Sequence, residues 1–399
     1  MKFSVLIPTR NRLEYLKYAI TSVLQQEEMD FEIIVTDNCS EQDIKGYIDS
    51  LQDPRIKYFR SEIFLSVTEN WNAALNKSSG DWVIMLGDDD CLMRGYFSTI
   101  SKILNHFENP DFIYTSGYIF AYPHVLPLHP KGLLKIGGNA SFLENQKNCY
   151  WIDPLTARKL AQGSCNFTNS FAYNMQYALI NRAFIEKIKI HDQFFHSPYP
   201  DFYAMNAMML KGARILACPF LMVAVGITPK SYGYYYFNKK ESDGICFLKN
   251  TKIKEDLPDL SQILLPGPDM NESWLYAMES LKQFFPEEHL TVSYKRYRLL
   301  QIFATYKSAF LKEKRASFKA LWTKLFFLER LYVIPIHLLY LSSHLFPYFI
   351  CKKAGQFLIK ILHLNRHFSS KDIQPSVPTI LDFFTTIEPI VFNNPASRL

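Results

Sequence analysis

The sequence predicts an α/β fold in which a parallel sheet is covered by helices on both faces. Over the first 90 residues, short apolar segments typical of strands alternate with segments whose apolar residues recur at helical spacing. The links between them are short, which is typical of strand–helix–strand units. In such sheets, ligands bind beyond the carboxyl ends of the strands. We therefore expect a ligand site where the strands end.

The individual elements follow one another in a regular order. The first strand begins at Phe3 and is broken by Pro8, and a helix with apolar residues from Leu13 to Leu24 comes next. The following elements are a strand over 31–36, a helix over 43–51, a strand over 56–60, a helix over 68–77 and a strand over 82–86. Further strands are expected over 113–118, 214–217 and 220–225, and a lid over the ligand is expected over 228–236.

Three consecutive carboxylates, Asp88, Asp89 and Asp90, follow the strand over 82–86. Like charges this close repel one another, so their juxtaposition at a strand end needs a compensating cation. Hard divalent ions such as Mg²⁺ and Mn²⁺ prefer oxygen ligands and commonly also hold substrate phosphates. The triplet therefore predicts a metal-diphosphate site, and a solvated acidic turn is the alternative.

Five stretches in the first 100 residues resemble the family 2 glycosyltransferases, which have the GT-A fold. They are SVLIPTRNR at 4–12, IIVTDNCS at 33–40, NWNAAL at 70–75, GDWV at 80–83 and the acidic triplet itself. The resemblance implies an inverting enzyme that uses a nucleotide-diphosphate sugar and a bound Mn or Mg ion. Two departures from the usual pattern stand out. Gly87 replaces an acidic residue, and Asn38-Cys39 stand where Asp and Gly are common.

The resemblance also implies roles for individual residues. Asp89 would be the main metal ligand, with Asp90 beside it. The residues implied to bind the nucleotide sugar are Pro8, Thr9, Arg12, Asp37, Asn38, Asn70 and Asp88. For Asn70, a satisfied polar position on its helix is an equal alternative.

The general base is expected on a different segment, because it must approach the acceptor hydroxyl from the opposite face of the sugar. The family supplies a carboxylate about a hundred residues further on, at the start of a helix. Asp201 is the best match, since Pro200 precedes it and an apolar helix follows. A helix-capping role is the alternative for Asp201, and Asp192 and Asp153 are weaker candidates for the base.

The charge of the chain is unevenly placed. The formal net charge is +6, but residues 289–399 carry 16 Lys and Arg against 5 Asp and Glu. Residues 331–350 contain no charged side chain. We expect helices that lie in the membrane interface with cationic residues on anionic headgroups. A single span over 331–350, and packing onto the catalytic domain or a second subunit, are the alternatives. Nucleic acid is not expected as a partner, because no binding module accompanies the charge.

These observations predict three regions. Residues 1–238 form the GT-A catalytic domain, with a nucleotide-sugar half over 1–100 and an acceptor half over 101–238 that contains an insertion at 123–169. A linker and helix cover 239–288, and a basic, aromatic helical region covers 289–399. The seven cysteines show no Cys-x-x-Cys pair and are expected to be reduced in the cytoplasm.

The sequence therefore predicts a metal-dependent inverting glycosyltransferase that moves a sugar from a nucleotide-diphosphate donor to a hydroxyl acceptor. The acceptor is expected to be lipid-linked, in assembly of an O-antigen or capsule-type surface polysaccharide at the inner face of the cell membrane. A catalytically inactive nucleotide-sugar-binding scaffold is the alternative. A sugar nucleotidyltransferase is less favoured, because the glycine-rich first loop of those enzymes is missing.

Overall fold

The computed structural model describes residues 1–27, 30–137, 140–238, 259–310, 318–343, 375, 377–387 and 390. The chain divides into two compact units. The first unit comprises Met1–Ala161, Phe171–Lys252 and Phe368–Leu399, and the second comprises Gln162–Ser170 and Ile253–His367. The candidate site residues all lie in the first unit, so we describe that unit first.

A mixed sheet forms the centre of the first unit. Its described strands are β1 (Phe3–Thr9), β2 (Phe31–Asp37), β3 (Ile56–Arg60), β4 (Trp82–Met85), β5 (Cys91–Leu92), β6 (Phe112–Ala121), β7 (Leu133–Gly137), β8 (Tyr150–Ile152), β9 (Ala178–Asn181) and β10 (Ile215–Ile227). The order is β3-β2-β1-β4-β9-β6-β10-β5, with β7 paired to β6 and β8 to β10. Strands β3, β2, β1 and β4 are parallel, whereas β9 runs antiparallel to both β4 and β6. The predicted α/β class is confirmed, and the sheet is mixed rather than parallel throughout.

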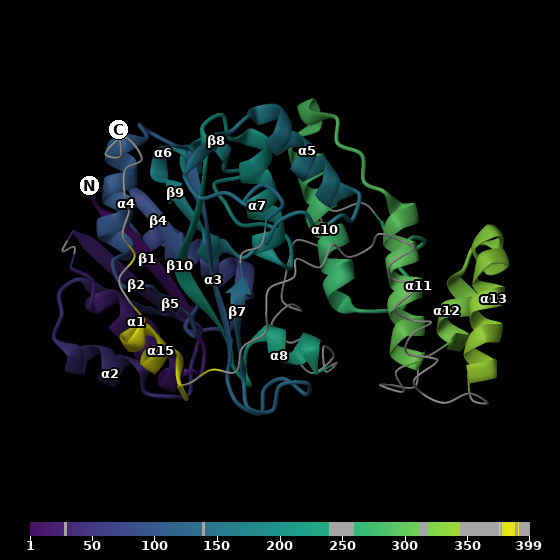
Figure 1. Ribbon diagram of the computed structural model, residues 1–399, viewed down its shortest axis with the longest axis horizontal. Helices are drawn as coiled ribbons and strands as arrows, with labels where there is room; N and C mark the ends of the chain where they lie inside the picture. Colours follow the sequence, from purple (N-terminus) through teal and green to yellow (C-terminus); the bar gives the residue numbers. More distant parts are fainter. Residues whose placement is uncertain are drawn as a thin grey trace. The chain divides into compact units, whose positions relative to one another are not determined.

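Helices cover both faces of this sheet. They are α1 (Leu13–Leu24), α2 (Ile44–Leu51), α3 (Val67–Lys77), α4 (Tyr96–His106), α6 (Arg182–Ile188), α7 (Pro200–Lys211), α8 (Tyr232–Phe237) and α15 (Ile380–Thr386); α5 (Pro154–Cys165) follows β8. The connections through α1 and α2 lead from β1 to β2 and from β2 to β3, toward one edge of the sheet. The connection through α3 leads from β3 back past β1 to β4. Right-handed crossovers therefore place α3 on the face opposite α1 and α2, as Figure 1 shows.

Pro8 ends the pairing of β1 with β4 without ending β1. The strand continues to Thr9, and Pro8 stands opposite Thr36 of β2, so the expected break at Pro8 is wrong. Leu86 donates its N–H to the carbonyl of Leu6 at 2.8 Å. The next donor on that edge of β1 would be residue 8, and proline has no N–H to give. The chain is thus released from β1 directly before the acidic triplet.

Two other expectations about the later chain need correction. The strands expected over 214–217 and 220–225 form one strand, β10, with a shift in its pairing to β6 between Ala217 and Leu221. The expectation of reduced cysteines is wrong for one pair, because Cys149 and Cys218 form a disulfide. Among the described cysteines, Cys39, Cys91 and Cys165 are free.

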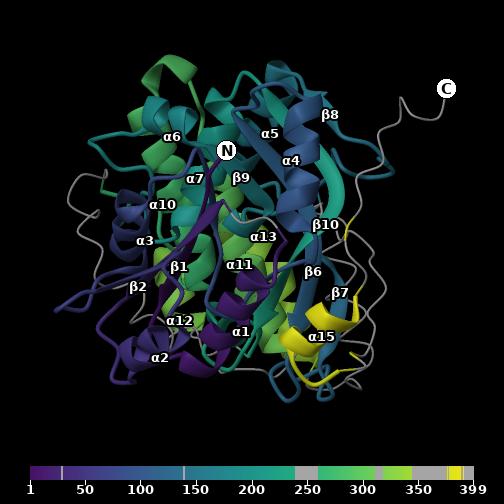
Figure 2. The same ribbon diagram turned by 90° about the vertical axis from the view of Figure 1, so that its left-hand side faces the viewer.

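The segment that contains α15 packs against the first unit although it comes from the region expected to be a basic tail. Helix α15 contacts α1 and β5, and Figures 1 and 2 both show it beside α1. Ile380 and Phe383 join a buried apolar cluster with Phe120 and Tyr122 of the sheet. The N–H of Ile390 donates to the carbonyl of Arg94 at 2.9 Å.

The described part of the second unit is helical. Its helices are α10 (Asp269–Phe284), α11 (Tyr294–Phe310), α12 (Phe318–Lys324) and α13 (Phe327–Ser343). Helices α11, α12 and α13 lie in the region 289–399 that was expected to be helical, and residues 311–317 of it lie outside the described residues. Of the span considered at 331–350, residues 344–350 also lie outside them. No helix among the described residues has the length and apolar character needed to cross a membrane.

Candidate active site

The site lies where the order of the sheet reverses. The chain runs from β1 outward through β2 and β3 and then returns to the other side of β1 as β4. Such a switch point leaves a crevice at the carboxyl ends of the two strands on either side of it. Thr9 ends β1 and Asp88 follows β4, and the Thr9 hydroxyl donates to Oδ2 of Asp88 at 2.8 Å. Both residues are buried.

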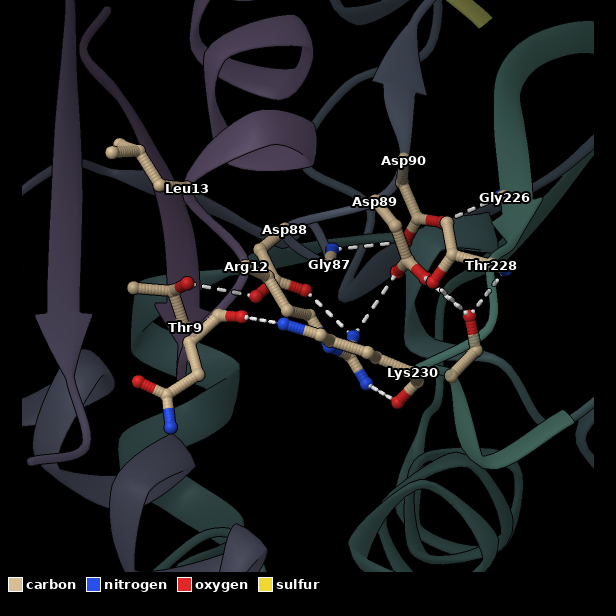
Figure 3. A network of polar contacts seen from close by, with 12 residues as sticks. Thr9, Arg12, Leu13, Gly87, Asp88, Asp89, Asp90, Gly226, Thr228 and Lys230 are labelled. Atoms are coloured by element: carbon tan, nitrogen blue, oxygen red, sulfur yellow. Dashed lines mark hydrogen bonds and ion pairs between the residues drawn. The ribbon is translucent and has the colours of Figure 1, made fainter. Parts of the chain in front are cut away.

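The guanidinium of Arg12 lies between two of the three carboxylates, as Figure 3 shows. Its Nη1 atom is 2.8 Å from Oδ1 of Asp88 and 3.6 Å from Oδ1 of Asp89. Burial lowers the pKa of Arg12, but the negative charges of Asp88 and Asp89 outweigh it, so the pKa is raised overall. The protein itself therefore supplies one cation to the acidic triplet.

Asp89 contacts the segment that follows β10. Its Oδ2 atom accepts hydrogen bonds from the hydroxyls of Thr228, at 3.0 Å, and Ser231. The same segment is tied to the loop after β1, because Arg12 donates to the carbonyl of Lys230. The segment expected to be a lid thus forms a short turn and the helix α8, and it touches the acidic triplet directly.

Asp90 is held by three donors of the protein. Its Oδ2 accepts from the N–H of Gly87 at 2.9 Å and from the Gln176 amide at 2.6 Å, and its Oδ1 accepts from the N–H of Gly226 at 2.8 Å. Burial, reinforced by the charge of Asp89, raises the pKa of Asp90. These contacts make Asp90 a bridge between the turn after β4 and strand β10.

The glycine before the triplet has a steric reason. A Cβ atom at position 87 would lie 2.4 Å from Oδ2 of Asp90, so a side chain there would push the Asp90 carboxylate away. Gly226 is equally constrained, because a Cβ there would lie 1.9 Å from the backbone oxygen of Asp89. The Asp90 carboxylate turns back toward residue 87, and only a glycine at that position leaves room for it.

The carboxylates differ in how well they fit a divalent ion. Mg²⁺ in nucleotide sites is bound by one or two carboxylates together with substrate phosphates. Both oxygens of Asp90 already accept hydrogen bonds, whereas Oδ1 of Asp89 lies 3.6 Å from Nη1 of Arg12, on the side of the guanidinium in Figure 3. Within the described residues, no group of three or more His, Cys, Asp and Glu side chains is arranged to hold a metal ion. An ion held by Asp89 would therefore need oxygen atoms of a bound ligand to complete its shell.

Asp37 forms a second acidic position at the end of the neighbouring strand β2. Its Oδ2 accepts from the Tyr58 hydroxyl at 2.7 Å and from Arg60 at 3.1 Å, and its Oδ1 accepts from the N–H of Ser40 at 2.9 Å. Burial and the adjacent Asp37 carboxylate raise the pKa of Tyr58 to about 12. The carboxylate is thereby fixed in orientation at the edge where a nucleotide is expected.

The two asparagines implied to bind the nucleotide make contacts that anchor the backbone. Asn38 exchanges two 2.8 Å hydrogen bonds with the backbone of Leu65, and Asn70 donates to the carbonyl of Thr36 at 3.4 Å. The nearby Asn72 of α3 binds the backbone of Phe194 and Phe195 through its side-chain amide. That contact ties α3 to the segment leading to Asp201.

Asp201 lies in the first turn of α7, and Tyr199 holds the N-cap position. The Asp201 carboxylate accepts the N–H of Phe202 at 2.9 Å. Burial raises the pKa of Asp201 to about 7. A carboxyl group with this pKa exchanges a proton near neutral pH, which is the property that a general base needs.

The start of α8 connects the N-cap of α7 with the acidic triplet. The ring of Tyr232, at the start of α8, packs against the ring of Tyr199 with the centroids 4.8 Å apart. The preceding residue, Ser231, donates to Asp89. A continuous path of contacts therefore runs from the main carboxylate of the triplet to the helix start that carries Asp201.

Sequence reasoning missed several residues that shape this site. Tyr58 and Arg60 lie on a predicted strand, and the only signal for them is their place at the end of β3, next to Asp37. Gln176 and Gly226 give no local signal, because neither belongs to a motif. Gln176 reaches the triplet from the 3-10 helix before β9, and Gly226 reaches it from β10. Thr228 and Ser231 were placed in the expected lid without a role in holding Asp89.

The sheet and the carboxylates at its switch point form an α/β domain with a candidate ligand site. Residues 4–173 match the model of the family described as Glycosyl transferase family 2. The predicted resemblance is thus confirmed for the region that carries the triplet.

Three curated relatives share the N-terminal part. The GalNAc(5)-diNAcBac-PP-undecaprenol beta-1,3-glucosyltransferase of Campylobacter jejuni is 41% identical over 107 residues, covering 26% of this chain and 35% of its own. The putative colanic acid biosynthesis glycosyl transferase WcaA of Escherichia coli is 30% identical over 135 residues, covering 32% and 48%. The abequosyltransferase RfbV of Salmonella typhimurium is 31% identical over 110 residues, covering 26% and 33%. The chain thus spans less than half the length of these relatives.

Among solved structures, the crystal structure of S. aureus TarS 1-349 is similar at 16% identity, with a TM-score of 0.45. The match covers 77% of this chain and 79% of that one. The same protein in complex with UDP-GlcNAc gives 15% identity and a TM-score of 0.46, over 77% of this chain and 85% of that one.

Proposed function

We propose that the protein is a metal-dependent inverting glycosyltransferase that moves a sugar from a nucleoside-diphosphate donor to a hydroxyl acceptor. The observation that carries the proposal is the path of contacts that joins Asp89, through Ser231 and Tyr232, to Tyr199. Tyr199 is the N-cap of the helix whose first turn holds Asp201, a carboxyl group with a pKa of about 7. The two groups lie on separate segments, as expected when one serves the leaving group and the other serves the acceptor.

At the donor end, a divalent Mn or Mg ion would stabilise the negative charge that develops on the leaving diphosphate. We assign Asp89 as the carboxylate that holds it. Arg12 would lie beside the same diphosphate, and Asp37, held by Tyr58 and Arg60, would meet the base or ribose of the nucleotide. Asp90 would act by fixing the turn that carries Asp89.

At the acceptor end, Asp201 would take the proton of the attacking hydroxyl. Hydrolysis of the donor sugar is prevented only when the donor is shielded from water. Ser231 and Tyr232, at the start of α8, contact Asp89 at the donor end and Tyr199 at the acceptor end. We infer that Thr228 and Ser231 support Asp89 while Tyr232 shapes the acceptor side near Tyr199.

The setting that we propose is assembly of a surface polysaccharide of the O-antigen or capsule type. The names of the relatives support it, since one acts on an undecaprenol-linked glycan and another belongs to colanic acid biosynthesis. We propose a lipid-linked acceptor and a peripheral location on the inner face of the cell membrane. The exposed positive charge of the second unit supports that location.

Two measurements test the proposal. Calorimetric titration with UDP, GDP, CDP and dTDP, each with and without Mn²⁺, should reveal metal-dependent binding of one nucleotide. Asp89→Ala should abolish it, whereas Asp49→Ala, which removes an exposed carboxylate of α2, should leave it unchanged. Metal-independent binding, or none, would contradict the metal site.

Sugar transfer to a bacterial lipid extract then separates an enzyme from an inactive scaffold. The wild type should transfer sugar and Asp201→Asn should not, while both bind the nucleotide equally. A wild type that binds the nucleotide and transfers no sugar from any donor of that nucleotide would favour the scaffold.

A further inference from the structure

Helix α13 carries a stripe of exposed apolar side chains. Phe327, Leu331, Ile334, Leu338 and Leu341 are spaced alternately by four and three residues, so they lie on one side of the helix. Their exposed fractions are 74%, 54%, 42%, 59% and 51%. We call these five residues the α13 stripe. Large aliphatic and aromatic groups so exposed along about four turns of helix indicate a surface that is covered in use.

The apolar surface is wider than the stripe itself. Leu328 is 70% exposed, Pro335 is exposed, and Tyr332 is 37% exposed. At about 100° per residue, these side chains extend the apolar arc to about half of the circumference of the helix. A seam between two coiled helices is narrower and is flanked by charged residues. The width favours a flat apolar medium over a single partner helix.

The charges around the stripe have one sign. Over the described residues of α12 and α13, Lys319, Lys324 and Arg330 are exposed. The acidic residue of this stretch, Glu329, is buried and pairs with Arg298 at 2.6 Å. Within the described parts of α12 and α13, the exposed charge is therefore entirely positive, which complements anionic headgroups.

The opposite side of α13 packs against α11 and α12 within the second unit. Val333 belongs to a buried cluster with Ile302, Tyr306 and Leu321, and the Tyr306 hydroxyl hydrogen-bonds with His337 at 2.9 Å. The Arg298 guanidinium that pairs with Glu329 also donates to the carbonyl of Lys324, which ties α12 to α13. The stripe is thus presented by a helix that is already folded.

We propose that the α13 stripe is the surface by which this protein docks on an anionic lipid bilayer. The helix lies in the plane of the interface, its apolar arc enters the boundary between headgroups and acyl chains, and Lys319, Lys324 and Arg330 contact the headgroups. The inference rests on the proposed peripheral location and names the surface that provides it.

The test is sedimentation of the full chain with vesicles of phosphatidylcholine, with and without phosphatidylglycerol. The wild type should bind the vesicles that contain phosphatidylglycerol, and added salt should weaken the binding. The double variant Leu331→Asp/Leu338→Asp should bind at least about tenfold more weakly, because two apolar groups are lost and two negative charges are added. Leu128→Asp, which changes an 88% exposed leucine of the first unit, is the matched control and should bind as the wild type does.

A charge variant gives a second readout. Lys319→Gln/Lys324→Gln/Arg330→Gln should lose the preference for phosphatidylglycerol while the apolar stripe is intact. Circular dichroism and the nucleotide titration should be unchanged in all variants. The docking surface and the donor site can therefore fail separately.

Three results would overturn the proposal. The first is a wild type that does not bind vesicles containing phosphatidylglycerol. The second is a Leu331→Asp/Leu338→Asp variant that binds them like the wild type. The third is a wild type that sediments as an oligomer without binding vesicles and becomes monomeric in the double variant, which would assign the stripe to a contact between two copies of the chain.

Discussion

The guanidinium of Arg12 lies 2.8 Å from the carboxylate of Asp88 and 3.6 Å from that of Asp89. Three adjacent carboxylates require a neighbouring cation. Arg12, from the loop after β1, supplies a positive charge at this place. The protein can thus fold with these carboxylates partly neutralised, and a metal–diphosphate complex would meet a site that already contains positive charge.

Replacing Arg12 should make the fold depend on added metal. Arg12→Gln removes the charge that offsets the buried Asp88 and Asp89, so the free energy of unfolding should fall by about 3 kcal/mol. Because Mn²⁺ can take over part of that role at Asp89, it should raise the melting temperature of Arg12→Gln more than that of the wild type. Thermal unfolding with and without Mn²⁺ measures both effects. Arg94→Gln, at an exposed arginine, is the control, and an equal response of both variants to Mn²⁺ would contradict the assignment.

The rate of sugar transfer should rise with pH through about 7. Burial raises the pKa of Asp201 to about 7, and the base must be deprotonated to accept a proton. Asp201→Asn should lower kcat by about 10²–10⁴-fold and remove this dependence. Asp192→Asn, at an exposed aspartate, should retain both the rate and the pH profile. A wild-type profile that is flat between pH 6 and 8, around the raised pKa, would exclude Asp201 as the base.

Asp201→Asn, which should lose activity, should be more stable than the wild type above pH 7. The folded-state pKa of Asp201 lies above the usual value, so the favourable contribution of the neutral carboxyl is present at low pH and is lost as the pH rises through about 7. An asparagine stays neutral, and the free energy of unfolding of Asp201→Asn should therefore exceed that of the wild type above pH 7. Urea unfolding at several pH values measures the difference, which should shrink in acid.

Gly226 should tolerate no side chain. The Cβ of Gly226→Ala would lie 1.9 Å from the Asp89 carbonyl oxygen, so β10 or the acidic turn must shift, and the free energy of unfolding should fall by about 3 kcal/mol. Nucleotide binding should fall with it. Gly163→Ala provides the contrast, because its Cβ meets nothing within 4 Å in α5, and it should stabilise the protein by about 1 kcal/mol. If Gly226→Ala and Gly163→Ala were equally stable, the close contact between β10 and the backbone of Asp89 would be contradicted.

A buried glutamate should make the first unit sensitive to acid. Glu32 is buried, which raises its pKa, but hydrogen bonds from Lys57, Ser4, Ser79 and Lys2 outweigh burial and lower the pKa to about 2. Its contribution to stability is present above the unfolded-state pKa and is lost as the pH falls toward 2. Glu32→Gln should cost about 1–3 kcal/mol at neutral pH and progressively less below pH 4, as measured by denaturant unfolding. A difference that does not vary with pH would show that the charge is not what stabilises.

Much of the fold could be predicted because its signals are local. The strands from β1 to β4 and the helices between them follow from apolar spacing, and Asp88 and Asp201 follow from a strand end and a helix start. The antiparallel strand β9 between β4 and β6 could not be predicted, because its pairing joins segments far apart in the chain.

The hydrogen-bond partners of the acidic triplet could not be predicted for the same reason. Gln176 lies 86 positions from Asp90, and Thr228 lies 139 positions from Asp89. A hydrogen bond over such a separation depends on the finished sheet and leaves no trace in spacing. The roles of the nucleotide-binding and metal residues stay predictions, and the titrations described above examine them.

The return of α15 to the first unit has a consequence for biosynthesis. The apolar cluster that holds Phe120 and Tyr122 includes Ile380 and Phe383, which the ribosome adds more than 250 residues later. The nascent chain must therefore carry an incomplete first unit, with the α1 and β5 surface uncovered, while the whole second unit is made. Removing the chain after residue 367 to isolate the transferase would leave that surface bare and prone to self-association.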